Sequence, residues 1–599
     1  MRVADYIAKF IYENGTKHVF MFSGGGIMHL TDGLACNKNL KKICVHHEQT
    51  ASMAIEAYSR LTGKMGVGYF TTGPGATNAL TGLAGAWLDS VPCLFISGQA
   101  KRKDSVRMAK IPGLRQVGVQ EIDIIPVIKS VTKYSAFVDN PNDIKYHLQK
   151  AYYFAKEGRP GPVWLDIPLD VQGAEIDEKN LKSFYAPKEK NKISDGDIKK
   201  IIKYLKSAKR PVILAGYGVR ISGAKSQLSD FAKKYKIPVV TTYLGVDLIE
   251  ENHACYSGRI GIKGTRSGNL AVQNSDLLIV IASSLPVAEV NYEYSQFARD
   301  AKIVVVDIDM SSHKKKTIKI DTLIKGDVKE FLEKLLKNSK KENFDFDKNW
   351  LKTCAGWKKK YPVCLPEYKK LKNKINLYYF LEKLSQKLSK NDVVITDAGS
   401  VFYVGSQGIK IKKGMRYITS GGLATMGYSL PAGIGASVGL ENKRTICITG
   451  DGSFQLNIQE LQTLVHYKLP VKLFVINNGG YLSIRFTQRK FFNSRFIGVD
   501  KNSGISFPNI EKIAKAYGIK FVRAKNNKEL GAALDKTLKY KGPVICEIIS
   551  PENQEIIPAV ASEKNPDGAM VSKPLEDMYP FLDREEFKKE MIIKPLKNN

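Results

Sequence analysis

Short apolar runs alternate with longer amphipathic stretches over residues 1–180. Residues 65–70, 92–96 and 163–168 have the length and composition of buried strands, and the stretches between such runs have helical character. Alternation of this kind is typical of a parallel sheet wrapped by helices. The pattern therefore predicts an α/β unit over residues 1–180, which ends after the strand and turn at 161–168.

The same alternation occurs twice more along the chain. It predicts a second unit over residues 190–340 and a third over residues 375–550. The apolar runs that indicate these two units are 211–215, 277–281, 303–307, 393–397, 445–449 and 471–476. The predicted fold class is therefore α/β, with three consecutive doubly wound parallel-sheet domains.

Polar, lysine-rich segments separate the predicted domains. Residues 185–194 have the composition of a linker, and residues 338–374 combine many lysines with two prolines. Residues 551–599 follow the third domain as a C-terminal tail. The position of this tail at the end of the chain suggests a lid over the site.

The chain is strongly basic, with 92 Lys+Arg against 59 Asp+Glu and a formal net charge of +33. A charge of this size favours a polyanionic partner in principle. The lysines, however, gather in polar stretches such as 314–316 and 358–360, without the interleaved aromatic residues of a nucleic-acid surface. We interpret them as solvated surface and expect no nucleic-acid partner.

Length and local composition limit the class of protein further. A chain of 599 residues is too long for one small binding module and corresponds to about three or four domains. No apolar run is long enough to cross a bilayer, and Asp5 stands where a signal peptide needs an apolar segment. The eight cysteines form no Cys-x-x-Cys pair. We expect reduced core cysteines and a cytoplasmic protein without membrane contact.

The third unit contains the pattern that says most about chemistry. The strand at 445–449 leads into Gly450-Asp451-Gly452-Ser453, and the strand at 471–476 leads into Asn477-Asn478-Gly479-Gly480. There are 24 residues between Gly452 and Asn477. Because parallel strands end at one edge of a sheet, both segments are predicted at the ligand-binding edge. Glycines allow a diphosphate to approach the backbone, and a carboxylate with an amide oxygen can hold a hard divalent cation.

Either segment alone also fits a simple turn, since Asp-Gly and Asn-Gly pairs favour turns. The combination, at this spacing and after two strands, resembles the thiamine diphosphate motif. The other motifs of that family occur in the family's order: His47-Glu48-Gln49, 73–78, Ser97-Gly98-Gln99 and 420–428. Up to about residue 582 the chain resembles the acetohydroxyacid synthase (acetolactate synthase) large subunits, a type of thiamine diphosphate enzyme.

The resemblance implies roles for the domains and for single residues. In this family the first domain binds the cofactor's pyrimidine, the third binds its diphosphate, and the middle one is structural or holds a second nucleotide. Glu48 matches the catalytic acid beside the pyrimidine, and Gln99 matches a glutamine near the reacting carbonyl. His29 replaces a proline on a loop that faces the cofactor, and is either an active-site group or a packing residue.

The same resemblance implies the ligands of the metal and the cofactor. Asp451, Asn478 and the carbonyl of Gly480 match the protein ligands of magnesium. Met426 matches the wedge that bends the cofactor, with a core position as the alternative, and the carbonyl of Ala424 matches the acceptor for the cofactor's amine. The other residues predicted to contact the cofactor are Gly25, Pro74, Asn78, Gly399, Ser400, Gly450, Gly452, Ser453, Tyr481 and Leu482.

The chain departs from the family around the second substrate. The family's arginine-phenylalanine-aspartate-aspartate-arginine run helps hold FAD and the acceptor's carboxylate, but residues 282–289 contain no arginine. Thr487 replaces a tryptophan that favours a longer acceptor, and Ser483 replaces a methionine. Ser400-Val401 replaces a glutamine-histidine pair. FAD is therefore doubtful, and the acceptor pocket is predicted to be more polar than in the family.

Two further features carry weaker signals. Gly216-Tyr217-Gly218 follows a strand, as nucleotide-binding glycines do, but lacks the third glycine of the dinucleotide fingerprint. Arg485 follows the metal motif and could attract an anionic substrate, although arginines near helix starts are often solvated.

These observations predict a thiamine diphosphate- and magnesium-dependent enzyme that decarboxylates a small 2-keto acid, with pyruvate as the first choice. The two-carbon unit passes to a carbonyl acceptor, and the polar pocket favours a keto-sugar or another polar ketone. The alternatives are a true acetolactate synthase and a thiamine diphosphate enzyme that cleaves carbon–carbon bonds without decarboxylation, such as a cyclic dione hydrolase. The presence of Glu48, Asp451 and Asn478 disfavours a non-catalytic scaffold subunit.

The resemblance also implies an assembly. The family builds its site from the first domain of one chain and the third domain of another, so a homodimer is the smallest assembly expected. The sequence leaves open whether dimers pair into tetramers.

Overall fold

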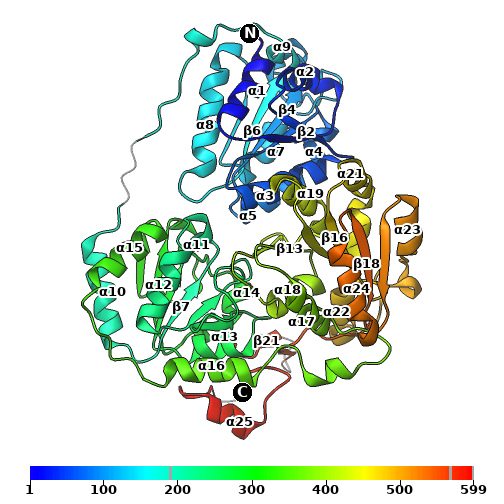
Figure 1. Ribbon diagram of the computed structural model, residues 1–599. Coiled ribbons are helices and arrows are strands. Elements are labelled where there is room, and N and C mark those ends of the chain that lie inside the picture. Colours follow the sequence, from blue (N-terminus) through cyan, green and yellow to red (C-terminus); the bar gives the residue numbers. More distant parts are fainter. Residues whose placement is uncertain (188–191, 565–569, 597–599) are drawn as a thin grey trace. The chain divides into compact units, whose positions relative to one another are not determined.

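The apolar runs of the sequence form the strands of three sheets (Figure 1). The computed structural model describes residues 1–187, 192–564 and 570–596, so parts of the predicted linker and tail lie outside the described residues. Each of these sheets has six strands. Inner strands such as β3 (Gly66–Phe70), β10 (Leu277–Ile281) and β16 (Val471–Asn477) are buried along most of their length. Strands covered by helices on both faces need such continuous apolar runs. The predicted α/β fold class is confirmed.

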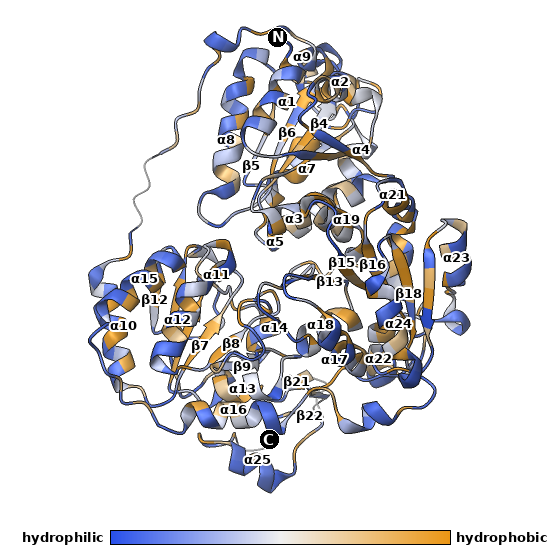
Figure 2. Cartoon of the chain, viewed as in Figure 1, coloured by the Kyte–Doolittle hydropathy of each residue, from blue (hydrophilic) through white to orange (hydrophobic). Residues whose placement is uncertain are grey.

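Contacts divide the chain into two units. The first consists of residues 1–188, 392–402 and 418–552, and the second of residues 189–391, 403–417 and 553–599. The first unit contains the first sheet and most of the third-domain sheet. The second contains the sheet of the central domain and most of β14 (Arg416–Ile418), the edge strand of the third-domain sheet. In Figure 2, strands β7 (Pro211–Ala215), β16 and β18 (Val544–Ile549) are coloured mainly as hydrophobic, consistent with their buried positions.

The first sheet has the strand order β2-β1-β3-β4-β6-β5. Its strands are β1 (His18–Met21), β2 (Lys41–Cys44), β3 (Gly66–Phe70), β4 (Cys93–Gln99), β5 (Tyr134–Phe137) and β6 (Val163–Pro168). Its strand pairs are parallel, and Val67 of β3 lies beside Val19 of β1 and Leu94 of β4. The order reverses between β1 and β3, which is where open α/β sheets bind their ligands.

The third-domain sheet repeats this topology, with the order β14-β13-β15-β16-β18-β17. Its strands are β13 (Val393–Thr396), β14 (Arg416–Ile418), β15 (Thr445–Gly450), β16 (Val471–Asn477), β17 (Lys520–Ala524) and β18 (Val544–Ile549). Its reversal point lies between β13 and β15, and β16 is the next strand along. The predicted metal motif therefore begins on strands at and beside the ligand-binding position of this sheet.

Two helices join the sheets of the first unit. Helix α3 (Glu48–Thr62) packs on α19 (Ser429–Gly439), and the two lie side by side in Figure 1. A Cβ on Gly435 of α19 would lie 2.0 Å from the carbonyl oxygen of Ala54 in α3, so glycine allows this close approach. One hydrophobic core includes Trp164 of the first sheet and Cys447 of the third-domain sheet.

Three helices cover the opposite face of the first sheet. They are α1 (Val3–Glu13), α2 (Met28–Cys36) and α8 (Ile144–Lys156), and their apolar residues form a second core with the strands. Helices on both faces make this sheet doubly wound, as predicted. None of the helices within the described ranges is long and apolar enough to span a membrane.

The central sheet has the different order β12-β11-β10-β7-β8-β9. Its strands are β7 (Pro211–Ala215), β8 (Val239–Thr241), β9 (Tyr256–Arg259), β10 (Leu277–Ile281), β11 (Lys302–Asp307) and β12 (Thr322–Lys325). Counted along the domain, this is the order of dinucleotide-binding folds. The lysine-rich segment 338–374 contains helix α16 (Trp350–Lys360), whose Trp350 and Trp357 are buried in a core of this domain. That segment is therefore partly folded onto the central domain.

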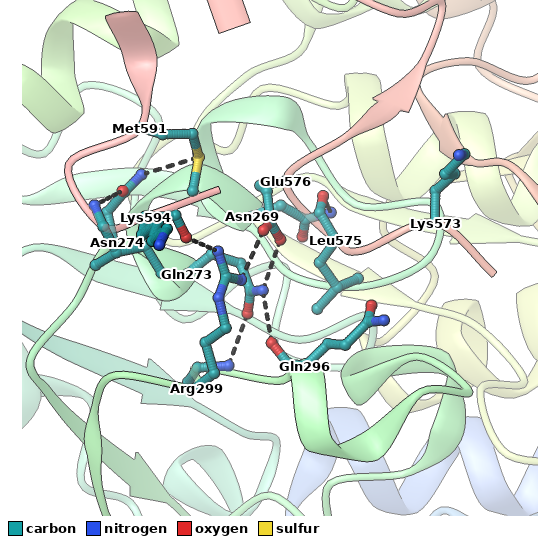
Figure 3. A network of polar contacts seen from close by, with 12 residues as sticks. Asn269, Gln273, Asn274, Gln296, Arg299, Lys573, Leu575, Glu576, Met591 and Lys594 are labelled. Carbon is teal, nitrogen blue, oxygen red and sulfur yellow. Dashed lines mark hydrogen bonds and ion pairs between the residues drawn. The ribbon is translucent and has the colours of Figure 1, made fainter. Parts of the chain in front are cut away.

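Residues 573–596 of the C-terminal tail are bound to the central domain (Figure 3). Glu576 accepts hydrogen bonds from Nε2 of Gln273 at 2.7 Å and from Nη1 of Arg299 at 2.6 Å. Asn269, like Gln273, belongs to α13 (Arg266–Gln273), and its Nδ2 donates to the carbonyl of Leu575 at 2.9 Å. Glu576 is 1% exposed, so this attachment is part of the domain's interior. The lid function of the tail stays a prediction.

The cysteines follow the expectation only in part. All eight are free, and six of them are buried. Cys36, at the end of α2, and Cys44, at the end of β2, are exposed, so the prediction of a core position is wrong for these two. Each is the last residue of its helix or strand, where an apolar residue next to it in the sequence does not ensure that it is buried.

Alanine should have opposite effects on stability at two helix glycines, one at the close contact between α3 and α19 and one in open space. Gly435→Ala should lower the free energy of unfolding by about 1–3 kcal/mol, because the new methyl group collides with the backbone of α3. Gly531→Ala, in α24 (Asn527–Lys539), should raise it by about 0.4–1 kcal/mol, since nothing lies within 4 Å of that position. Thermal unfolding of the two variants measures both. Equal midpoints would contradict the packing assigned to Gly435.

Candidate active site

Asp451 lies at the end of β15, where the chain enters the short helix α20 (Asp451–Phe454). The residue is 3% exposed. Its Oδ1 accepts from the N–H of Gly452 at 2.9 Å, and its Oδ2 accepts from the N–H groups of Asn478 at 3.2 Å and Gly480 at 3.1 Å. Burial raises the pKa of Asp451 to about 6, although these N–H groups oppose the shift. A bound cation would offset the cost of burying this charge.

Asn478 follows β16, the strand paired with β15. The residue is 4% exposed, and its amide oxygen Oδ1 is buried without a hydrogen-bond partner. An unsatisfied buried group of this kind costs about 1–3 kcal/mol. Asp451 and Asn478 thus offer a carboxylate and an unpaired amide oxygen on adjacent strand ends, and this donor set fits Mg²⁺. The described residues contain no cluster of three His, Cys, Asp or Glu side chains that could hold another metal.

Glycines shape the backbone around these oxygens. A Cβ on Gly450 would have no atom within 4 Å, so this position borders open space. A Cβ on Gly452 would lie 2.1 Å from the ring of Tyr481, and one on Gly480 would lie 2.0 Å from the carbonyl oxygen of Val499. Gly480 also has a φ of +139°, which other residues rarely adopt. Packing requires Gly452 and Gly480, whereas Gly450 leaves room for a ligand.

Four other residues predicted at the cofactor follow the ends of β13, β15 and β16. Ser453, in α20, and Leu482, the first residue of α22 (Leu482–Phe491), are buried. Gly399 and Ser400 follow β13, the other neighbour of β15. A Cβ on Gly399 would lie 3.6 Å from Oγ of Ser483, and this hydroxyl is buried without a hydrogen-bond partner. The ends of β13, β15 and β16 therefore converge on one region.

Ala424 and Met426 lie on the loop between β14 and α19. Met426 is half-buried and not a core residue, so the core alternative is wrong. Ala424 has a φ of +52°, a strained conformation for alanine, and the loop is held by Oγ of Ser420, which accepts from the N–H of Thr425 at 3.1 Å. The strain and the half-exposed methionine are consistent with a loop that meets a ligand.

A buried ion cluster fixes the start of this loop to the first domain. Asp89 accepts from the N–H of Gly422 at 2.7 Å through Oδ1 and from the N–H of Gly421 at 2.9 Å through Oδ2. Arg60 of α3 forms ion pairs with both Asp89 and Glu56, and all three side chains are almost fully buried. Sequence reasoning missed this cluster, because Asp89 and the loop that it holds are distant in the chain from Glu56 and Arg60, which lie one turn apart in α3.

Glu48 is the first residue of α3 and is 5% exposed. His47 caps the helix by accepting from the N–H of Gln49 at 3.1 Å. The Nδ2 group of Asn78 donates to Oε2 of Glu48 at 3.1 Å. Asn78 ends α4 (Pro74–Asn78), so two of the predicted motifs meet in one hydrogen bond. The structure therefore brings Glu48, Pro74 and Asn78 together on the first domain.

Gly25 is the first residue of the short 3₁₀ helix η1 (Gly25–Ile27), which follows β1 and packs on the loop after β3. A Cβ on Gly24 would lie 2.5 Å from Oγ1 of Thr71, and a Cβ on Gly26 would lie 2.0 Å from Oγ1 of Thr72. Gly25, between them, would have no atom within 4 Å of a Cβ. Its neighbours are packing glycines, whereas Gly25 borders open space at the reversal point of the first sheet.

Gln99 is held within the first domain by both ends of its amide. Its Nε2 donates to the carbonyl of Ile122 at 2.8 Å and to Oδ2 of Asp166 at 3.1 Å, and its Oε1 accepts from the N–H of Ala100 at 2.9 Å. Asp166 is fully buried, which raises its pKa to about 7, and sequence reasoning missed it. An acid within an apolar strand was the signal that could have revealed it. The role of Gln99 at the reacting carbonyl stays a prediction.

His29, on α2, packs against the backbone of the segment after α9 (Leu169–Gln172). Its ring Nε2 lies 3.0 Å from the place that a Cβ on Gly173 would occupy. This contact supports the packing alternative for His29. Its role as an active-site group stays a prediction.

Arg485 is buried, at 5% exposure, within α22 and is not solvated. Its Nη2 donates to the carbonyl of Gly479 at 2.8 Å, and its Nη1 donates to the carbonyl of Glu552 at 2.6 Å. The guanidinium is therefore occupied by backbone acceptors next to the metal motif.

The glycines that gave a nucleotide signal in the central domain have a packing role. A Cβ on Gly216 would lie 2.0 Å from the carbonyl oxygen of Ala282, and a Cβ on Gly218 would lie 2.6 Å from Cβ of Ala282. Ala282 follows β10, the strand paired with β7. Close contact between two strand ends therefore explains both glycines.

Comparison with protein families matches three consecutive models. The N-terminal TPP binding domain of thiamine pyrophosphate enzymes matches residues 1–147, their central domain matches residues 198–335, and their C-terminal TPP binding domain matches residues 397–548. These matches, with the paired sheets and the strand-end site, define the class of the fold as that of the thiamine pyrophosphate enzymes.

Curated relatives narrow the class. The chain is 35% identical to the acetolactate synthase large subunit of Porphyra purpurea over 568 residues, which cover 93% of each chain. It is 32% identical to that of Lactococcus lactis over 565 residues, covering 93% of this chain and 94% of the relative. It is 33% identical to that of Corynebacterium glutamicum over 598 residues, covering 98% and 92%. The chain therefore belongs to the acetolactate synthase large-subunit family of thiamine pyrophosphate-dependent enzymes.

Alanine variants of Gly450 and Gly452 distinguish a glycine that contacts the ligand from one that is needed for packing. Gly450→Ala should leave thermal stability unchanged but weaken thiamine diphosphate binding by about tenfold, because the new methyl group occupies space beside the strand ends. Gly452→Ala should lower the melting temperature, because its methyl group collides with the ring of Tyr481. Calorimetric titration and thermal unfolding measure the two effects. Unchanged cofactor affinity in Gly450→Ala would remove that residue from the site.

Proposed function

We propose that the enzyme uses thiamine diphosphate and Mg²⁺ to decarboxylate a small 2-keto acid, with pyruvate as the first choice, and to transfer the two-carbon unit to a carbonyl acceptor. The observation that carries this proposal is the pair of oxygens at the ends of β15 and β16. Asp451 offers a buried carboxylate, and Asn478 offers a buried amide oxygen without a partner. Family membership supports the cofactor, and the donor set supports the metal.

The third domain would hold the cofactor's diphosphate end. Asp451, Asn478 and the carbonyl of Gly480 would bind the metal, and the open position at Gly450 would admit the diphosphate to the backbone. Ala424 and Met426 would contact the middle of the cofactor from their strained loop. Thiamine diphosphate, when bound, supplies the nucleophilic carbon and the electron sink that decarboxylation of a 2-keto acid needs.

Glu48 would hold and move the proton that activates the cofactor. Its carboxyl group is buried, which limits exchange of that proton with water. Asn78 donates to its Oε2 and so orients the carboxyl group, leaving Oε1 for the cofactor's ring nitrogen. The residue is at the first turn of α3, which the contact with α19 holds rigidly in place.

The acceptor is proposed to be a keto-sugar or another polar ketone. Ser483 stands where the family has a methionine, and its Oγ is buried without a hydrogen-bond partner near Gly399. A hydroxyl in that state favours a ligand that brings its own polar group. The second candidate is acetolactate synthesis from two pyruvate molecules, which the names of the relatives favour.

We further propose a homodimer in a reducing compartment such as the cytoplasm. Three apolar side chains between β4 and α7 (Ile124–Ile128) are exposed: Ile111 at 58%, Val117 at 48% and Val119 at 87%. Apolar groups gathered on one loop favour a covering partner, and a second copy of the chain is consistent with the family's shared site. The free state of all eight cysteines supports the compartment.

Product analysis distinguishes the candidates. The purified protein is incubated with thiamine diphosphate, Mg²⁺ and pyruvate, with and without a keto-sugar, while carbon dioxide and products are followed by mass spectrometry. We expect faster carbon dioxide release with the keto-sugar and a product that is two carbons larger. Acetolactate as the main product in both mixtures would favour the second candidate. Absence of carbon dioxide release with every acceptor would contradict decarboxylation of pyruvate.

Glu48→Gln tests the assigned proton carrier. The amide retains the size of the side chain but cannot hold the transferable proton, so turnover should fall by about 10²–10⁴-fold. Cofactor affinity, measured by calorimetry, should change little, because the diphosphate and metal provide most of the binding. Glu13→Gln makes the same exchange on the exposed surface of α1 and should retain full activity. An active Glu48→Gln enzyme would refute the assignment.

A further inference from the structure

We propose that Arg485 is a positioning residue that fixes the metal-binding loop from its far side. This inference rests on the proposed metal site. The loop of residues 478–481 connects β16 to α22, and it has to place the oxygens of Asn478 and Gly480 correctly for a metal. The backbone of a free loop can adopt several conformations. Holding the metal-binding loop in one of them needs contacts on more than one side of the loop.

One side of the loop is held by Asp451. Its carboxylate accepts from the N–H groups of Asn478 and Gly480, as described above. These bonds use donors of the loop and leave its carbonyl groups to be satisfied elsewhere. Buried carbonyl groups also need partners.

Arg485 supplies those partners. Its Nη2 donates to the carbonyl of Gly479 at 2.8 Å, and its Nη1 lies 3.4 Å from the carbonyl of Asn478 and donates to that of Glu552 at 2.6 Å. Val499 adds a further anchor, because its carbonyl accepts from the N–H of Tyr481 at 2.9 Å. The rigid guanidinium fork thus ties successive carbonyls of the loop to a neighbouring segment, which a lysine ammonium cannot do with the same geometry.

Arg485 is almost fully buried, and its charge is compensated within the third domain. The side chain is 5% exposed, and its Nε lies 3.5 Å from Oδ2 of Asp500, which compensates the charge. A Cβ on Gly480 would lie 2.6 Å from Nη2 of Arg485, so only glycine lets the loop sit this close to the guanidinium. Arg485 therefore acts on the metal through the loop.

Metal affinity, rather than activity, tests this role. Binding of Mn²⁺ in the presence of thiamine diphosphate is measured by electron paramagnetic resonance for the wild type, Arg485→Lys and Arg485→Met. We expect both variants to bind Mn²⁺ about 10–100-fold more weakly, the usual effect of removing a group that orients metal ligands. At saturating Mg²⁺, kcat of Arg485→Lys should return close to the wild-type value, while the Mg²⁺ concentration needed for half-maximal rate stays raised.

Controls separate this inference from the proposed function and from general damage. The control is Arg444→Lys. Arg444 directly precedes β15, at the end of the strand opposite Asp451, and pairs with Asp392, so this variant should leave Mn²⁺ affinity unchanged. Melting temperatures without metal identify loss of fold, and if Arg485→Met is unfolded, Arg485→Lys alone decides. Wild-type affinity in folded Arg485→Lys would overturn the inference. Failure of the wild type to bind Mn²⁺ with thiamine diphosphate would instead contradict the proposed metal site.

Discussion

The buried pair of Asp451 and Asn478 is the interaction on which the account of this enzyme depends. A carboxylate that is 3% exposed and an amide oxygen without a partner are both costly in a folded protein. Three backbone N–H groups reduce the cost for the carboxylate but leave the amide oxygen unsatisfied. A divalent cation would satisfy both groups at once, which is why the arrangement is best understood as a site built for a ligand.

The surrounding fold serves to hold that pair and the acid Glu48 in fixed places. The first and third domains have the same strand order, so each presents a reversal point where loops from neighbouring strands meet. Helix α3 begins with Glu48 and ends near Arg60, which with Asp89 secures the loop that carries Met426. One rigid helix is therefore connected both to the predicted proton carrier and to the predicted cofactor wedge.

Much of this organisation could be predicted from the sequence, because it depends on local pattern. Apolar runs identified the strands, and the spacing between Gly452 and Asn477 identified two neighbouring strand ends. The resemblance supplied the residues that match the family. In the structure a hydrogen bond from Asn78 to Glu48 connects two of the family's motifs. Local pattern was sufficient here because each motif lies directly after the element that positions it.

The remaining features depend on partners distant in the chain. Nothing beside Arg485 in the sequence indicates that Glu552 will accept its hydrogen bond, and nothing beside Asp89 indicates that Gly421 and Gly422 will. The attachment of the tail to the central domain and the packing of His29 on Gly173 are likewise tertiary contacts. Exposure of Cys36 was missed for the same reason, since burial is decided by what covers a residue.

The most direct measurement is an anomalous difference map from a crystal grown with Mn²⁺ and thiamine diphosphate. A single manganese peak at coordination distance from Oδ of Asp451 and Oδ1 of Asn478, with the diphosphate beside Gly450, is the expected result. A cofactor bound elsewhere, or ordered cofactor with no manganese at these two oxygens, would contradict the central claim.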